Sequence, residues 1–117
     1  MNILDRAKAD FREKLSNGLV CVEVPEWGED DEPAKLYFKP YLSLTEQAQA
    51  EKLTEEGVKG LAGLLIMRAL DEEGNKVFPK TSERELMNSV DPDVIGRIFM
   101  NLSHQVQVLE LERIKGN

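Results

Sequence analysis

The chain has 117 residues, a length that suits one domain and is too short for two. Hydrophobic residues make up 41% of it, which is enough for a packed core. The net charge of −7 argues against binding to nucleic acid or to an anionic membrane surface, because both need clustered Lys and Arg. The single cysteine excludes an internal disulfide framework, and the sequence has neither a signal core nor the ~20 apolar residues that cross a bilayer. We therefore expect a soluble, cytoplasmic protein.

The first element is predicted to be an amphipathic helix over residues 2–16. Asn2 is its expected cap, and Asn17-Gly18 is expected to end it. The apolar residues recur four apart and share one face, with Leu4 beside them: Ile3, Ala7, Phe11 and Leu15.

Two alternating segments, residues 19–24 and 34–39, predict an antiparallel hairpin with one face on the helices. The other face is expected to place Glu23 near a lysine. Between the strands, residues 25–33 predict an acidic, solvated loop longer than a tight turn. Pro25 and Pro40 are expected either to stop the strands or to mark an edge of the sheet.

The middle of the chain predicts a surface helix and then a buried one. Ser43 and Glu46 form a capping-box pattern for a polar helix starting near residue 44, with three apolar anchors: Leu44, Ala48 and Leu53. After a break near Gly57, residues 58–70 are apolar on nearly every side, as a central buried helix is. The glycines at 57, 60 and 63 either let another backbone approach or mark a loose first turn.

Residues 71–75 predict the C-terminal turn of that helix, with Gly74 left-handed, and Val77 and Phe78 are expected to return to the core. A second capping-box pattern, Ser82 with Glu85, predicts a short helix ending near Val90. Asp91-Pro92 starts the last helix. Its apolar stripe is Ile95, Ile98, Phe99, Leu102, Val106 and Leu109.

Residues 105–111 also alternate, so both strand and helix are open there, and we favour helix. The prediction is thus a single α+β domain over 1–117, mainly helical, with about five helices and one antiparallel β-hairpin packed on them. Its core spans about 2–111, and residues 112–117 are left as a C-terminal tail that can be flexible.

No pattern of catalytic, cofactor-binding or metal-binding residues emerges, so an enzyme is not expected. His104 is the sole histidine and Cys21 the sole thiol, and zinc or nucleophilic catalysis needs further partners. Calcium would need spaced ligands, which the run of acids at 29–32 lacks.

The candidate protein-binding residues are an acidic run and three aromatics. The run could attract a basic partner, and exposed aromatics often anchor interfaces. For Trp27 we favour the alternative that it folds down as a lid on the edge of the core. The candidates are Trp27, Glu29, Asp30, Asp31, Glu32, Tyr37 and Tyr41.

Four segments in order resemble the tail assembly chaperones of phages with long non-contractile tails. They are EVPEW (Glu23–Trp27), LYFKPYLSLTEQ (Leu36–Gln47), LLIMRALDEEGNKVF (Leu64–Phe78) and LMNSVDPDVIGRI (Leu86–Ile98). Beyond Ser103 the resemblance weakens.

The resemblance implies a protein that acts in the cytoplasm of the host bacterium of a phage or prophage. It would bind the tape measure protein, help to recruit tail tube subunits, and be absent from the mature virion. In that family a longer form often arises by a programmed frameshift. The alternative is a structural tail or head–tail connector protein. A homo-oligomer, the binding face and the phage of origin are left open.

Overall fold

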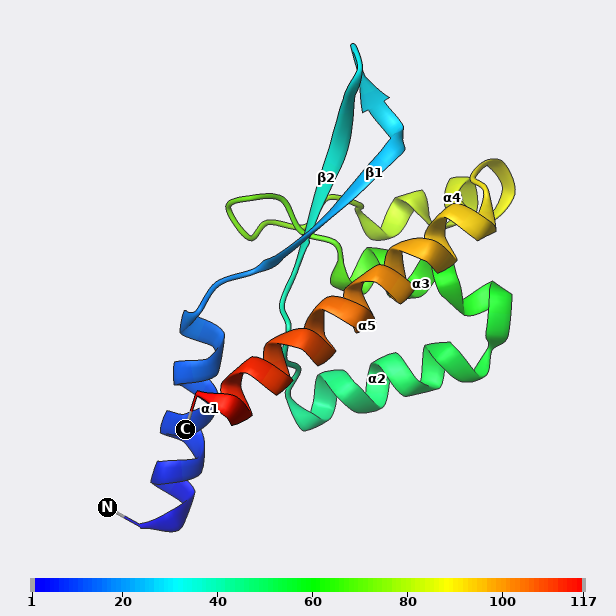
Figure 1. Ribbon diagram of the computed structural model, residues 1–117. Helices are drawn as coiled ribbons and strands as arrows, with labels where there is room; N and C mark the ends of the chain where they lie inside the picture. The colour runs from blue at the N-terminus through cyan, green and yellow to red at the C-terminus, as the bar shows by residue number, and fades with distance from the viewer. Residues whose placement is uncertain (1, 117) are drawn as a thin grey trace.

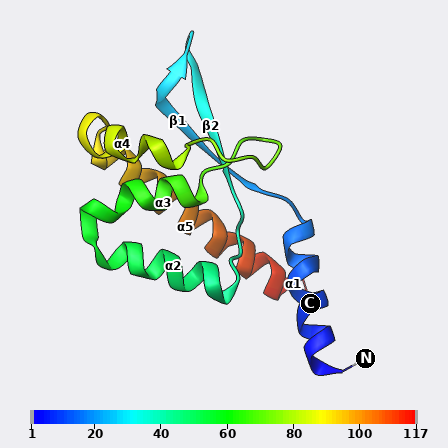
Figure 2. The same cartoon turned by 180° about the vertical axis from the view of Figure 1, so that it is seen from behind.

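The computed structural model describes residues 2–116 and has the predicted α+β architecture: a two-stranded antiparallel sheet packed on helices (Figures 1 and 2). The five α-helices of the described chain confirm the predicted fold class. In order, the elements are α1 (Ile3–Ser16), β1 (Val20–Glu29), β2 (Glu32–Phe38), α2 (Leu44–Glu55), α3 (Gly60–Arg68), α4 (Glu83–Ser89) and α5 (Pro92–Lys115), with short 3-10 turns at Gly57–Lys59 and Lys80–Ser82.

The core lies where one face of the hairpin meets α3, α4 and α5. Every second side chain is buried in residues 20–24 of β1 and 36–38 of β2, while the outer parts of both strands contain no buried residue. Phe38 meets Phe99 of α5 edge to face, with ring centroids 5.9 Å apart. The buried hydrophobic cluster comprises Val20, Val22, Val24, Leu36, Phe38, Ala62, Leu65, Ala69, Leu86, Val94, Ile95, Ile98 and Leu102.

The hairpin is longer and its turn tighter than the sequence predicts. The predicted loop at 25–33 and the stop at Pro25 are wrong, because β1 runs on to Glu29 and β2 starts at Glu32. The turn is only Asp30 and Asp31, both with positive φ (48° and 67°), a conformation that aspartate tolerates better than most residues. An irregularity between Val24 and Glu29 absorbs the extra residues of β1.

Gly28 is required inside that irregularity. A Cβ there would lie 1.9 Å from the carbonyl oxygen of Glu32, so a side chain would push the strands apart. On the regular part of the hairpin Glu23 pairs with Lys35, which confirms the expected cross-strand neighbour.

Helix α3 is central, as predicted, and contacts α2, α4 and α5. It ends at Arg68, earlier than the predicted boundary at residue 70, because Ala69 turns to an extended conformation. Leu70 then pairs with Tyr37 through two backbone hydrogen bonds of 2.9 and 2.8 Å. The segment after α3 thus satisfies polar groups on the free edge of β2.

Helices α2 and α3 meet at a close backbone contact. A Cβ on Gly60 would lie 1.8 Å from the carbonyl oxygen of Leu53, which supports the close-approach interpretation at this position. Gly57 has a positive φ of 68° in the turn between the helices. Of the predicted α2 anchors, Leu53 is half-buried but Leu44 and Ala48 are exposed, and Ala50 is the buried residue.

Local capping signals predict most helix starts correctly. Asn2 accepts from the backbone N–H of Asp5 (2.8 Å), and Ser43 and Glu46 form the reciprocal capping box. Asp91 accepts from the N–H of Asp93 (2.9 Å) at the start of α5, with Pro92 in the first turn. The predicted capping box at Ser82 is wrong, because its hydroxyl donates to the Pro79 carbonyl in the preceding 3-10 turn.

The turn after α3 has Gly74 left-handed (φ 87°), as predicted. Asp71 fixes it, since its carboxylate accepts from the N–H groups of Glu73 and Asn75, each at 2.9 Å. The turn joins two extended segments. The prediction that it is the C-terminal turn of the preceding helix is therefore wrong. Phe78 returns to the core, but the expectation for Val77 is wrong because it is exposed.

Helix α5 is continuous from Pro92 to Lys115, so residues 105–111 are helical, as favoured. The predicted tail at 112–117 is wrong for 112–115, which belong to the helix, and Asn117 lies outside the described residues. In both views the last turns of α5 lie beside α1, at the end of the molecule opposite the hairpin tip (Figures 1 and 2).

Candidate interaction surfaces

The predicted binding residues do not form one surface. The acidic residues Glu29, Asp30, Asp31 and Glu32 are exposed at the tip of the hairpin. Tyr37 is the second-last residue of β2, at the end away from the tip, and its backbone pairs with Leu70. Tyr41 follows β2 and lies near α1, with its ring 5.8 Å from the Lys14 ammonium. These groups therefore belong to separate parts of the molecule.

Trp27 packs inward. Its ring meets Phe78 edge to face, with centroids 6.3 Å apart, and it is half-buried against the core cluster, as the lid alternative expects. Beside it, Glu26 forms an ion pair with Arg97 of α5, and the hydrogen bond from Arg97 lowers the pKa of Glu26. These contacts hold the outer half of the hairpin against α5 and against the segment that precedes the 3-10 turn at Lys80–Ser82.

Large apolar side chains of α1 and α5 are exposed to solvent. Four of them have exposed fractions of 59–77%: Ile3, Leu4, Leu111 and Ile114. They belong to α1 and to the last turns of α5, and we call them the α1–α5 apolar surface. Neither helix buries these residues against the core, although the sequence pattern alone marks α1 as amphipathic.

A groove also involves α1 and α5. It lies between the end of α1, the start of β1 and the last turns of α5, and has a volume of about 660 Å³. Its apolar lining includes Leu19, Tyr41, Val108 and Leu109, with Lys14 and His104 among its polar groups. Among the described residues that line this groove, none belongs to the α1–α5 apolar surface, so the two features are distinct.

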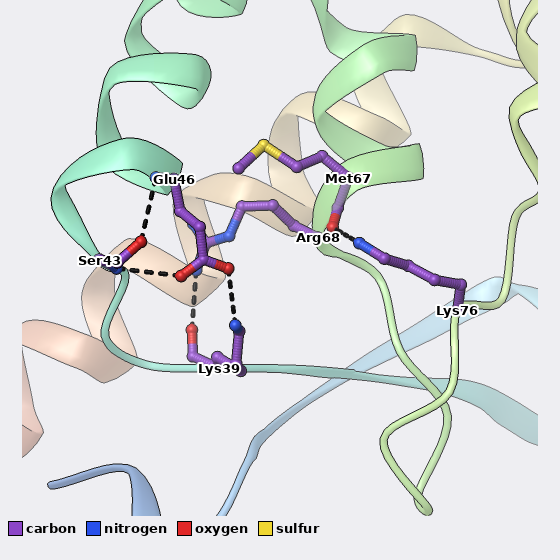
Figure 3. Close-up of polar contacts among 6 residues, drawn as sticks. All are labelled: Lys39, Ser43, Glu46, Met67, Arg68 and Lys76. Carbon is purple, nitrogen blue, oxygen red and sulfur yellow. Dashed lines mark hydrogen bonds and ion pairs between the residues drawn. The ribbon is translucent and has the colours of Figure 1, made fainter. Parts of the chain in front are cut away.

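A cluster of charged side chains lies where β2, α2 and α3 meet (Figure 3). The Lys39 ammonium lies 2.6 Å from Glu46 Oε2, and the Ser43 N–H donates to Glu46 Oε1 at 3.0 Å. The bond from Lys39, then that from Ser43, lowers the pKa of Glu46 to about 2. Glu46 therefore caps α2 and holds Lys39 at the same time.

Two further cations adjoin this pair (Figure 3). Arg68 Nη2 donates to the Lys39 carbonyl at 2.8 Å, and Lys76 Nζ donates to the Met67 carbonyl. Burial lowers the pKa of both Arg68 and Lys76. Together with Leu42 and Leu70 they line a pocket of about 260 Å³, which we call the cationic pocket.

Replacing Glu46 with glutamine tests the ion pair, because glutamine can still cap the helix. We expect Glu46→Gln to cost about 1 kcal/mol, since the carboxylate is 33% exposed and solvent screens the pair. The folded pKa of about 2 lies below the ordinary 4.5, so this contribution is full above pH 4.5 and is lost as the pH falls toward 2. Urea unfolding of the unmodified protein and of Glu46→Gln between pH 2 and 7 measures the difference in their free energies of unfolding. A difference that does not change with pH would contradict the ion pair between Lys39 and Glu46.

Within residues 2–116, no group of three or more His, Cys, Asp and Glu residues could hold a metal ion. Cys21 is half-buried in β1 and His104 is exposed on α5. None of the helices in the described part of the chain combines the length and apolar character needed to cross a membrane. Comparison of the chain with protein-family models, curated proteins and solved structures gives no match.

Proposed function

We propose that the protein is a tail assembly chaperone of a phage or prophage with a long non-contractile tail, and that it acts by binding other proteins and not by catalysis. The ordered resemblance of four sequence segments supports this proposal. The single structural observation that favours a binding role is the α1–α5 apolar surface, which leaves large side chains of two helices in solvent.

The partner in this proposal is the tape measure protein, a long helical protein with apolar stripes. An amphipathic helix binds well in a groove with apolar walls, and the 660 Å³ groove is lined in part by Leu19, Val108 and Leu109. The chain's net charge of −7 would keep such a complex soluble while the apolar stripes are covered. Many weak contacts along one rod give strong but reversible coating.

Binding to the tape measure protein of the same phage is the direct test. We expect micromolar or tighter binding in calorimetry, and a loss of at least tenfold in the double variant Leu4→Asp with Leu111→Asp, because two charges would enter the apolar contact. Leu44→Asp on α2 is the matched control, since Leu44 is also exposed and lies outside this surface. Absence of binding by the unmodified protein would contradict the proposal.

The chaperone role further predicts that the protein leaves before the tail is finished, after helping to recruit tail tube subunits. Mass spectrometry of purified virions checks this. The expected result is a signal well below one copy per tail, while a stoichiometric signal would identify a structural tail or connector protein instead.

The acidic hairpin tip is expected to attract basic partners without stabilising the fold. Converting Glu29, Asp30, Asp31 and Glu32 to their amides should leave the melting temperature unchanged or slightly higher, because Glu29 and Glu32 face each other across the strands. Binding to a lysine-rich peptide at low salt should weaken severalfold.

The control for the hairpin tip removes the same charge elsewhere, by converting the exposed Glu51, Glu55, Glu72 and Glu73 to glutamine. Equal weakening in both variants would show that only net charge matters. Loss of folding in the tip variant would show that these carboxylates stabilise the turn.

A further inference from the structure

The cationic pocket concentrates positive charge in an acidic protein. Lys39, Arg68 and Lys76 contribute three positive charges and Glu46 one negative charge, which leaves +2 around one small cavity. The whole chain carries −7. Folding brings these residues together from four segments, since one follows β2, one begins α2, one ends α3 and one follows the turn after α3 (Figure 3).

The positive groups are incompletely compensated. Among the described residues Arg68 forms no ion pair, and its one hydrogen bond goes to the neutral carbonyl of Lys39. Burial lowers the pKa of Arg68, and burial together with the nearby charge of Lys39 lowers that of Lys76, while Glu46 opposes both shifts. Arg68 is half-buried, while Lys39 and Lys76 remain accessible to a ligand from solvent. Glu46 is the one anion among the described residues that line the pocket.

We propose that the cationic pocket binds a doubly charged oxyanion of the phosphate type, either free or as a monoester on a larger molecule. Arg68 and Lys76 would donate to its oxygens, since a guanidinium and an ammonium are the usual phosphate donors in proteins. Lys39 remains bound to Glu46 and adds long-range attraction.

The size of the pocket agrees with this ligand. Its volume of about 260 Å³ exceeds the space of several waters at about 30 Å³ each, so a tetrahedral anion and some bound water fit. Leu42, Met67 and Leu70 form apolar walls, which strengthen electrostatic attraction inside the pocket.

The test is a titration of the full chain with inorganic phosphate at pH 8 and constant ionic strength. Binding is measured by calorimetry, and the effect on stability is measured by thermal unfolding. We expect saturable binding and a rise in melting temperature relative to sodium chloride. Lys76→Met should weaken phosphate binding about tenfold, and Lys76→Arg should restore it. Lys80→Met, which removes a lysine outside this pocket, is the matched control.

Acetate and phenyl phosphate complete the design. Binding of phenyl phosphate as well as phosphate would indicate a monoester on a larger molecule, and binding of phosphate alone would indicate the free ion. Equal stabilisation by acetate would overturn the requirement for two charges. No effect beyond chloride, or an equal effect on Lys76→Met and the unmodified protein, would overturn the site.

Discussion

Leu65→Asp is expected to abolish the folded state. Leu65 has an exposed fraction of 0% and belongs to the core cluster that also contains Phe38 and Ile98. Burying an unpaired carboxylate costs at least several kcal/mol, and the volume of the leucine is lost as well. Domains of this kind are stable by only about 5–15 kcal/mol, so this one change removes most or all of the stability.

Circular dichroism and thermal melting measure the effect, with Leu44→Asp as the control. Leu44 is 90% exposed in the first turn of α2, where a negative charge is favourable, so this variant should melt like the unmodified protein. Both variants make the same chemical change and differ only in burial. A normal cooperative melt for Leu65→Asp would show that α3 is not enclosed.

The second large effect is expected for Gly60→Ala. The new methyl group would lie 1.8 Å from the backbone oxygen of Leu53, and a backbone atom cannot rotate away as a side chain can. Helices α2 and α3 would have to separate, at a cost of about 3 kcal/mol. The higher helix propensity of alanine offsets about 1 kcal/mol of this cost at most, so the substitution remains destabilising.

Gly96→Ala is the matched control for this contact. Gly96 lies within α5, and a Cβ there would meet no atom within 4 Å, so the same substitution should stabilise by about 0.5–1 kcal/mol. Chemical denaturation therefore distinguishes the two glycines by sign. Changes in the same direction would contradict the close contact between α2 and α3.

The class of fold and the helix starts follow from local sequence. The caps at Asn2, Ser43 and Asp91 act on residues two or three positions away, so the required partners are visible in the sequence itself. The same reasoning fails at Ser82, where a competing bond to Pro79 is equally local. Apolar periodicity correctly predicts Ile95, Ile98 and Leu102 on the buried face of α5, but it misses the buried Val94 and wrongly includes Leu109, which is exposed.

The hairpin turn and the end of α3 depend on contacts across the chain. The turn at Asp30-Asp31 lacks the glycine that usually signals a tight hairpin, and the irregularity beside it depends on how closely Gly28 approaches Glu32. Leu70 leaves the helix to pair with Tyr37, which no pattern within residues 58–70 specifies.

The candidate surfaces were the hardest to predict. Composition and residue type select the acidic run and the aromatics, but tertiary packing turns Trp27 inward and separates the others. The α1–α5 apolar surface requires knowing that two terminal helices lie together, and the cationic pocket requires four segments to converge. The spacing of residues along the sequence shows neither the packing of the terminal helices nor the convergence of the four segments.

A sheet of two strands has two edges at which a further strand could add, and such edges promote fibrous aggregation. Here Leu70 occupies part of the outer edge of β2, and the Gln105 side chain donates to the Cys21 carbonyl of β1 at 2.9 Å. The acidic turn adds like-charge repulsion between copies at the far end. Both edges of this small sheet are therefore partly blocked against the addition of a strand from another copy.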